Sequence, residues 1–409
     1  MRTVFSAGIV HILDIAHCLF KNLIMKRFLI TFITSSIIIL ICSSLKNNIV
    51  RKSILNVDGL KNETTLKLSD DLYLEILPQM ELLSGVLSQT SWYDKYYKPN
   101  DCDSNQVYYQ NLRQFFSKYK NHEAVQLLEE LIKAGFAYNA PPSFITFLSY
   151  PDFDMKYEYT DVLIERAKGK ENLEKFRLSL KKLARESDFA SFYNSNMGTY
   201  KTLLADFSKD IKAEKIVSWH NKMFGYSGNE FHVILMPSMF IWSFGNRITA
   251  NDNLIIYAML AAKGDCKNQP KKDYKFVIVH EFGHSKIDTH VAKLDSFIRK
   301  NKIDTLYYPV AEKMKRQGYN TYQPFYCETI NNAFTLMAMK EIYNYDDSLI
   351  LERKNVLING GQYLLDFTIN MLDKYEKNRD KYKRFDDFLP VLFKEYLMHK
   401  DSLLRLANK

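Results

Sequence analysis

The sequence predicts an α+β protein that is predominantly helical, with a short sheet beside a helix that carries a metal-binding motif. Helical spacing of apolar residues dominates the chain, and with 46% hydrophobic and 14% aromatic residues it is able to bury a large core. Two segments, Glu230–Trp242 and Asn253–Leu260, instead have the composition of β-strands, with Gly245-Asn246 in the link between them. Both segments come just before the motif in the sequence.

Residues 1–45 are expected to be a leader. Met25-Lys26-Arg27 precedes an uncharged run from Phe28 to Leu45, which favours Met25 as the true start. A basic start before an apolar stretch is typical of a secretory signal peptide, and the run is short for a membrane span of about 20 residues. Cleavage near Ser43-Ser44, lipidation at Cys42 and retention as an anchor all stay open. We expect an exported protein that is secreted, periplasmic or anchored in the cell envelope.

The remaining chain divides into three predicted parts. A polar tether covers residues 46–65, a mainly helical N-terminal part covers 66–227, and the motif-bearing core with the C-terminal helices covers 228–409. A strand over Tyr73–Leu77 ends at Pro78. Apolar periodicity predicts helices at about 103–120, 122–136, 171–190, 198–224, 349–376 and 382–407.

Charge and cysteine content limit the class of partner. The net charge of +9 includes +4 (five basic minus one acidic residue) from the first 46 residues, which leaves +5 for the other 363. This mild excess comes without a basic run interleaved with aromatic residues, so no nucleic-acid partner is expected. Membrane association is expected only through the N-terminal segment, and the oligomeric state stays open. The cysteines after the leader are too few for a disulfide framework: Cys102, Cys266 and Cys327.

The most informative segment is His280-Glu281-Phe282-Gly283-His284, an H-E-x-x-H run. On an α-helix the two histidines share one face and are able to offer two imidazole nitrogens to one metal ion. Glu281 lies about 100° round the helix, where its carboxylate reaches a water on the metal. The pattern is typical of zinc-assisted hydrolysis. Gly283 costs about 1 kcal/mol inside a helix, so another backbone or a substrate is expected to approach it closely.

Catalytic zinc takes a third protein ligand, and one route supplies it from a later helix. Glu328 lies 44 residues past His284 and opens a segment with helical periodicity, with Pro324 marking a helix start. It projects from the face opposite the apolar stripe, as an exposed first-turn glutamate would. Glu312 is a weaker rival.

A second route uses His290, which stands at the spacing of the metzincin motif. Ile287 occupies the position where that motif has the glycine of a sharp turn, and a β-branched residue suits such a turn poorly. If the helix continues, His290 faces away from the metal. Asp288 shares the stripe of the two motif histidines and is either a partner that orients a ligand imidazole or a plain exposed residue.

These motifs resemble those of zincin metallopeptidases of the gluzincin type. The similarity is greatest to a family of secreted bacterial zincin-like proteins of unknown function, with H-E-F-x-H before a Glu-led helix, and it covers most of the chain after about residue 65. The resemblance implies one Zn2+ per chain bound by His280, His284 and Glu328, with Glu281 as the general base. It also implies an edge strand beside the cleft, to which an extended peptide adds by backbone hydrogen bonds.

Two features depart from that family or leave a role unassigned. Lys286 stands where zincins usually have a hydrophobic residue. The donor that stabilises the oxyanion is not identified, and Tyr319 and Tyr322 are candidates beside the simpler explanation of ordinary packing. We predict a zinc metallopeptidase that hydrolyses peptide or protein substrates. The alternative is a non-enzymatic, zincin-like surface protein that binds a partner.

Overall fold

The computed structural model describes residues 63–96, 106–238, 242–250, 253–262 and 273–407. Within these ranges the protein is α+β and predominantly helical, as predicted, and residues 61–409 form one compact unit. The leader, most of the tether, Cys102 and Cys266 lie outside the described residues, whereas Cys327 is a buried free thiol. In the described part of the chain, no helix is both long and apolar enough to cross a membrane.

The described strands form one mixed sheet in the order β1-β2-β3-β5-β4. Their bounds are β1 (Thr65–Lys67), β2 (Leu72–Glu75), β3 (Glu230–Met236), β4 (Phe244–Ala250) and β5 (Asn253–Ala261). Strands β2, β3 and β5 run parallel, while β1 and β4 are antiparallel additions at the two sides. The sheet therefore joins strands from both sides of the boundary predicted between residues 227 and 228. The division of the chain into parts at that boundary stays a prediction.

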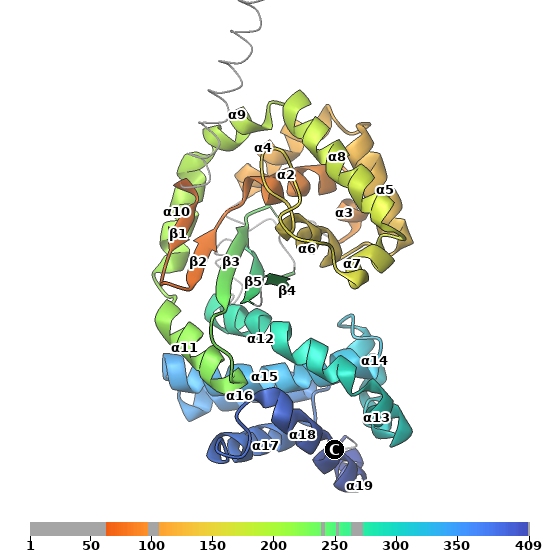
Figure 1. Cartoon of the computed structure of the whole chain (residues 1–409), viewed down its shortest axis with the longest axis vertical. Coiled ribbons are helices and arrows are strands. Elements are labelled where there is room, and N and C mark those ends of the chain that lie inside the picture. Colours follow the sequence, from red (N-terminus) through yellow and green to blue (C-terminus); the bar gives the residue numbers. More distant parts are fainter. Residues whose placement is uncertain (1–62, 97–105, 239–241, 251–252, 263–272, 408–409) are drawn as a thin grey trace, which may run out of the picture. The chain divides into compact units, whose positions relative to one another are not determined.

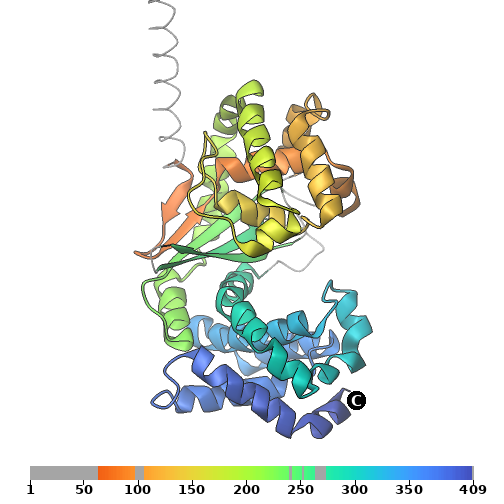
Figure 2. The ribbon, with the colours of Figure 1, turned by 45° about the vertical axis from the view of Figure 1, so that its right-hand side comes forward.

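Helices cover both faces of the sheet (Figures 1 and 2). Neighbouring strand residues point to opposite faces. On β4, Asn246 points to the face covered by the N-terminal helices and donates to the Thr146 hydroxyl. Its neighbour Arg247 points to the opposite face and donates to the Ser285 carbonyl. The helices before β3 are α2 (Pro78–Leu87), α3 (Ser91–Tyr96), α4 (Gln106–Ser117), α5 (Glu123–Ala134), α6 (Ala140–Thr146), α7 (Asp161–Arg166), α8 (Lys170–Glu186), α9 (Phe189–Ser195), α10 (Met197–Ser208) and α11 (Ala213–Phe224).

The helices after β5, coloured teal to blue in Figure 1, make up the other layer together with α11. They are α12 (Tyr274–Lys293), α13 (Asp295–Lys300), the 3-10 turns η1 (Ile303–Leu306) and η2 (Tyr308–Val310), α14 (Ala311–Lys315), α15 (Tyr322–Tyr343), α16 (Asp347–Asn359), α17 (Leu365–Lys377), α18 (Phe385–Met398) and α19 (Lys400–Leu406). Helix α11 packs on α12, α15 and α18.

Three predicted helices are each divided. The span 198–224 breaks between α10 and α11, and the span 382–407 breaks between α18 and α19 at His399. The span 349–376 breaks at Gly360-Gly361, where Gly361 has φ +117°.

Strand β4 corrects the prediction that Gly245-Asn246 forms a link between two strands. Both residues lie inside β4, which pairs with β5 over its whole length. Glycine is unfavourable inside a strand, but here α12 packs directly on the backbone of β4. A Cβ at Gly245 would lie 2.4 Å from the Glu281 carbonyl oxygen. The glycine therefore allows a close approach between the sheet and the motif helix.

A buried carboxyl group lies at the centre of the N-terminal helical layer. Glu81 of α2 has no exposed surface, accepts a hydrogen bond from the Tyr108 hydroxyl, and lies 3.3 Å from the Ser238 hydroxyl. Tyr108 in turn bonds Tyr200 at 2.8 Å, and no described group bonds the Oε1 atom of Glu81. Burial raises the pKa of Glu81 to about 8, although both hydroxyl hydrogen bonds act in the opposite direction.

This carboxyl group makes the free energy of unfolding depend on pH. Between the ordinary pKa of 4.5 and about 8, the folded state binds more protons than the unfolded state, so stability falls as pH rises through that window. We expect Glu81→Gln to exceed the parent in stability by on the order of 2 kcal/mol at pH 9, with little gain at pH 5. Chemical denaturation at both pH values measures this, with exposed Glu130→Gln as the control. An equal difference at the two pH values contradicts the prediction.

Candidate metal centre

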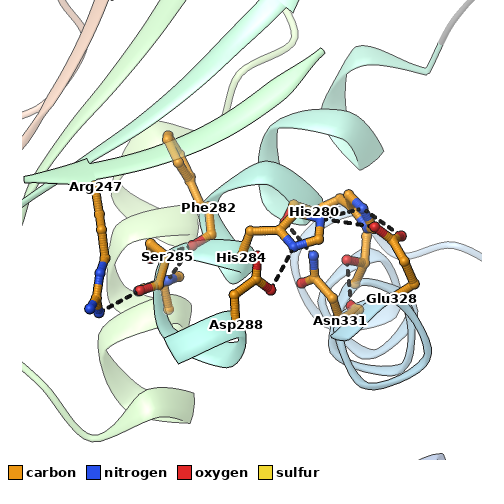
Figure 3. Close-up of polar contacts among 10 residues, drawn as sticks. Arg247, His280, Phe282, His284, Ser285, Asp288, Glu328 and Asn331 are labelled. Carbon is orange, nitrogen blue, oxygen red and sulfur yellow. Dashed lines mark hydrogen bonds and ion pairs between the residues drawn. The ribbon is translucent and has the colours of Figure 1, made fainter. Parts of the chain in front are cut away.

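Two helices carry the candidate ligands and pack against each other. Helix α12 begins after Asp273, whose carboxylate accepts from the Phe276 backbone N–H at 3.3 Å and also pairs with Arg353 at 3.2 Å. Helix α15 packs on α12 and is buried on most of its surface. Because α15 has several buried faces, its apolar stripe did not indicate the direction of Glu328. That side chain is 7% exposed and points at α12 (Figure 3).

The structure brings His280, His284 and Glu328 together. The two imidazole Nε2 atoms are 3.1 Å apart, and the two carboxylate oxygens of Glu328 lie 3.4 Å from one Nε2 atom each. Among the described residues, the side chains of His280, His284 and Glu328 form the group that could hold a metal ion. Two imidazoles and a buried carboxylate at such distances are stable only with positive charge between them, supplied by protons or by a metal.

Asp288 contacts the other side of one imidazole. Its Oδ1 lies 2.9 Å from Nδ1 of His284, as expected for the orienting role. The carboxylate accepts a hydrogen bond from the Nδ1–H group, so the lone pair of Nε2 stays available to a metal ion. The buried thiol of Cys327 also neighbours Asp288, and burial raises the pKa of that thiol well above its usual range, as does the carboxylate. The cysteine is therefore a packing residue.

The acidic side chains dominate the electrostatics of this group. Burial alone would lower the pKa of His284, but Asp288 and Glu328 raise it to about 10. Burial alone would raise the pKa of Glu328, but the two histidines and the Tyr319 phenol lower it below its usual value. The raised pKa of His284 and the lowered pKa of Glu328 both favour positive charge between these side chains, which a bound cation would supply in place of a proton.

Glu281 and Tyr319 lie next to the ligand group. Glu281 is 8% exposed, and its charge contributes to the raised pKa values of both His284 and Tyr319. Burial and a hydrogen bond to Glu328 also raise the pKa of Tyr319, so its hydroxyl stays protonated. The second tyrosine candidate, Tyr322, lies elsewhere: its hydroxyl bonds Asp295 and accepts from Arg299.

The other sequence candidates are not part of this group. Helix α12 continues through Ile287 to Lys293, so His290 stays on the helix and is absent from the ligand set. Glu312 pairs with Lys315 on α14 at 2.9 Å. Lys286 is buried, and its ammonium lies 3.7 Å from the centre of the Tyr226 ring, which explains how a lysine occupies a hydrophobic position.

Two residues near the ligands were missed by the sequence analysis. Arg247 ties β4 to α12 through the Ser285 carbonyl at 3.0 Å, and Asn331 of α15 donates to the His280 carbonyl at 2.7 Å (Figure 3). Arg247 had no local signal because β4 was not predicted. Asn331 follows Glu328 by three residues, a spacing that places both on one face of α15, and this was a usable signal.

The comparisons with known proteins identify a family without an assigned activity. The family described as a domain of unknown function (DUF4932) matches residues 72–395. No curated protein and no solved structure matches the chain. The matched region extends from β2 into α18 and contains both helices of the metal group.

Removing the third ligand tests the composition of the group. We expect Glu328→Ala to weaken zinc binding by more than about 100-fold, since even groups that only orient a ligand contribute about 10- to 100-fold. His290→Ala, on the same helix as the two histidines, should bind as the parent does. Competition against a chromophoric chelator measures both affinities. Loss of binding in His290→Ala with normal binding in Glu328→Ala would instead favour the His290 route.

The orienting role of Asp288 is tested separately. Asp288→Asn keeps the shape of the side chain but removes the charge that holds the Nδ1–H of His284, so zinc affinity should fall about 10- to 100-fold. The adjacent Thr289→Ala serves as the control in the same competition titration. Unchanged affinity in Asp288→Asn would make this residue a mere surface partner of the imidazole.

Proposed function

The chain belongs to the DUF4932 family, and we propose that it is a zinc-dependent metallopeptidase, a hydrolase of peptide bonds. The observation that carries this proposal is the convergence of His280, His284 and Glu328 next to Glu281. Two imidazoles and one carboxylate are the ligands of several catalytic zinc sites, which use three protein ligands. One Zn2+ per chain is therefore the proposed cofactor.

The donor geometry fits zinc. Around a tetrahedral zinc ion with bonds of about 2.0–2.1 Å, neighbouring ligand atoms are about 3.3 Å apart. The two Nε2 atoms are 3.1 Å apart, and each lies 3.4 Å from a different carboxylate oxygen of Glu328. One ligand atom from each of the three residues lies within 4.8 Å of the other two, close to the spacing that zinc requires. The nitrogen-rich set also suits zinc better than calcium or magnesium, which prefer oxygen ligands. The tautomer held by Asp288 presents the correct nitrogen of His284.

The side chains around the ligands supply the proton chemistry. A zinc ion held by His280, His284 and Glu328 would lower the pKa of a bound water molecule and polarise a carbonyl group. Glu281 takes a proton from the attacking water and gives it to the departing amine, a role for which its low exposure is suited. The protonated Tyr319 hydroxyl donates a hydrogen bond to the oxygen on which negative charge develops.

A peptide is the proposed substrate because of the position of β4. In the described sheet β4 has a neighbour on one side only, and it lies against α12. A Cβ at Gly245 would be 3.1 Å from Cβ of His284, so the strand passes beside a ligand. An extended chain that pairs with β4 brings its backbone into this region through main-chain hydrogen bonds. The leader pattern in the sequence supports an activity outside the cytoplasm, in the envelope or beyond it.

The mechanism is tested by Glu281→Gln, which removes the proton acceptor and leaves all three ligands. The full chain, dialysed against metal-free buffer, should retain about one zinc in parent and variant. The parent should cleave members of a peptide library, and the variant should be slower by at least about 1,000-fold.

Exposed Glu312→Gln serves as the matched control and should cleave as the parent does. Activity retained in Glu281→Gln argues against the proposed base. A parent that holds zinc but cleaves no peptide favours the alternative, a zincin-like binding protein.

A further inference from the structure

Helices α12 and α15 make a close contact where Gly283 faces Asn331. A Cβ built on Gly283 would lie 1.9 Å from Oδ1 and 3.0 Å from Cγ of Asn331, far inside contact distance. The asparagine is fully buried. The glycine inside the motif helix, predicted to be there for close approach, therefore makes room for one side chain of the second ligand helix.

That side chain bonds the backbone of a ligand. Nδ2 of Asn331 donates to the carbonyl oxygen of His280 at 2.7 Å, while no described group bonds its Oδ1. In an α-helix the same carbonyl accepts the backbone N–H four residues on, which belongs to His284. One amide group thus holds the peptide segment that links the two imidazole ligands. If the Asn331 amide were turned round, its Oδ1 would face the His280 carbonyl oxygen, and no hydrogen bond would form between them.

His280 depends on this contact more than His284 does. Nδ1 of His284 is held by Asp288, whereas Nδ1 of His280 is buried and has no hydrogen-bond partner among the described residues. The ring of His280 lies beside the nearly parallel ring of Phe276, with centroids 6.2 Å apart, and edge to face with the ring of His284, with centroids 4.8 Å apart. Its position is therefore set by the α12 backbone, which Asn331 holds.

Glu328 and Asn331 are three residues apart and lie on the same face of α15. One face of that helix thus provides both the carboxylate ligand and the amide that holds the other ligand helix. We propose that Asn331, seated in the notch at Gly283, is a positioning residue that sets the spacing of the ligands and thereby the affinity and coordination geometry of the site. This inference rests on the proposed metal binding.

Removing the amide should loosen the ligand set. We expect Asn331→Ala to lower zinc affinity about 10- to 100-fold and to shift the visible absorption bands of the Co2+-substituted protein, which report coordination geometry. Asn331→Asp keeps the volume but loses the donor, and it should give the same loss if the alanine variant does not fold. Asn332→Ala is the matched control, because that neighbouring buried residue bonds Gln362 at 3.0 Å, away from the ligands.

A pair of variants separates hydrogen bonding from packing. Gly283→Ala should disrupt the contact by collision with Asn331, and Gly283→Ala combined with Asn331→Ala should recover thermal stability, since the new methyl group fills the vacated space. The double variant should still bind zinc weakly, because the bond to His280 is missing. Recovery of full affinity in the double variant would overturn the role of the amide.

The measurement on the parent chain distinguishes the two proposals. If the parent binds zinc and Asn331→Ala and Asn331→Asp bind it within twofold with unchanged Co2+ spectra, the positioning role is wrong and the proposed function stands. If the parent takes up neither Zn2+ nor Co2+, both proposals fail together. Equal losses in Asn331→Ala and Asn332→Ala would also overturn the positioning role, since they would indicate general destabilisation.

Discussion

Helix α12 is packed between the sheet on one side and α15 on the other, and every group of the candidate centre depends on this arrangement. On the sheet side, Gly245 allows the backbone of β4 to reach Glu281. On the opposite side, Gly283 admits Asn331. Both glycines are unfavourable by local propensity, at about 0.5–1 kcal/mol each. Their cost is offset by close packing that a side chain at either position would prevent.

The buried charges of the centre explain why the packing has to be close. Glu328 is nearly inaccessible, and a carboxylate in such a place needs compensating charge within a few ångströms. The imidazoles provide it only if the two helices hold them at 3.4 Å. A looser contact would expose the group to competing water and leave His280 without a defined position. Binding of a cation and cohesion of the two helices are therefore expected to reinforce each other.

The sequence was a good guide where one helix contains the whole pattern. The pairing of His280 with His284 and the contact with Asp288 follow from spacing on a single helix, and the structure shows both contacts. Glu328 was found through the periodicity of its segment, but its direction was not, because α15 is buried on several sides. Strand β4 was missed since its glycine argues locally for a turn. At Gly283 another backbone or a substrate was expected, but the neighbour is the side chain of Asn331, because which residue lies there depends on the packing of two helices, which spacing alone does not give.

The sheet also has a consequence for the order in which the chain assembles. Strand β2 pairs with β3 in the register Leu72 to Phe231, a separation of 159 residues (231 minus 72), and β3 pairs with β5 only after that. Ten helices, α2 to α11, lie between β2 and β3 among the described elements. Closing so long a loop is slow compared with forming local helices. During synthesis β2 is able to pair with β1 at once, but its other edge has no partner until residue 231 has emerged, so that edge needs protection from other chains.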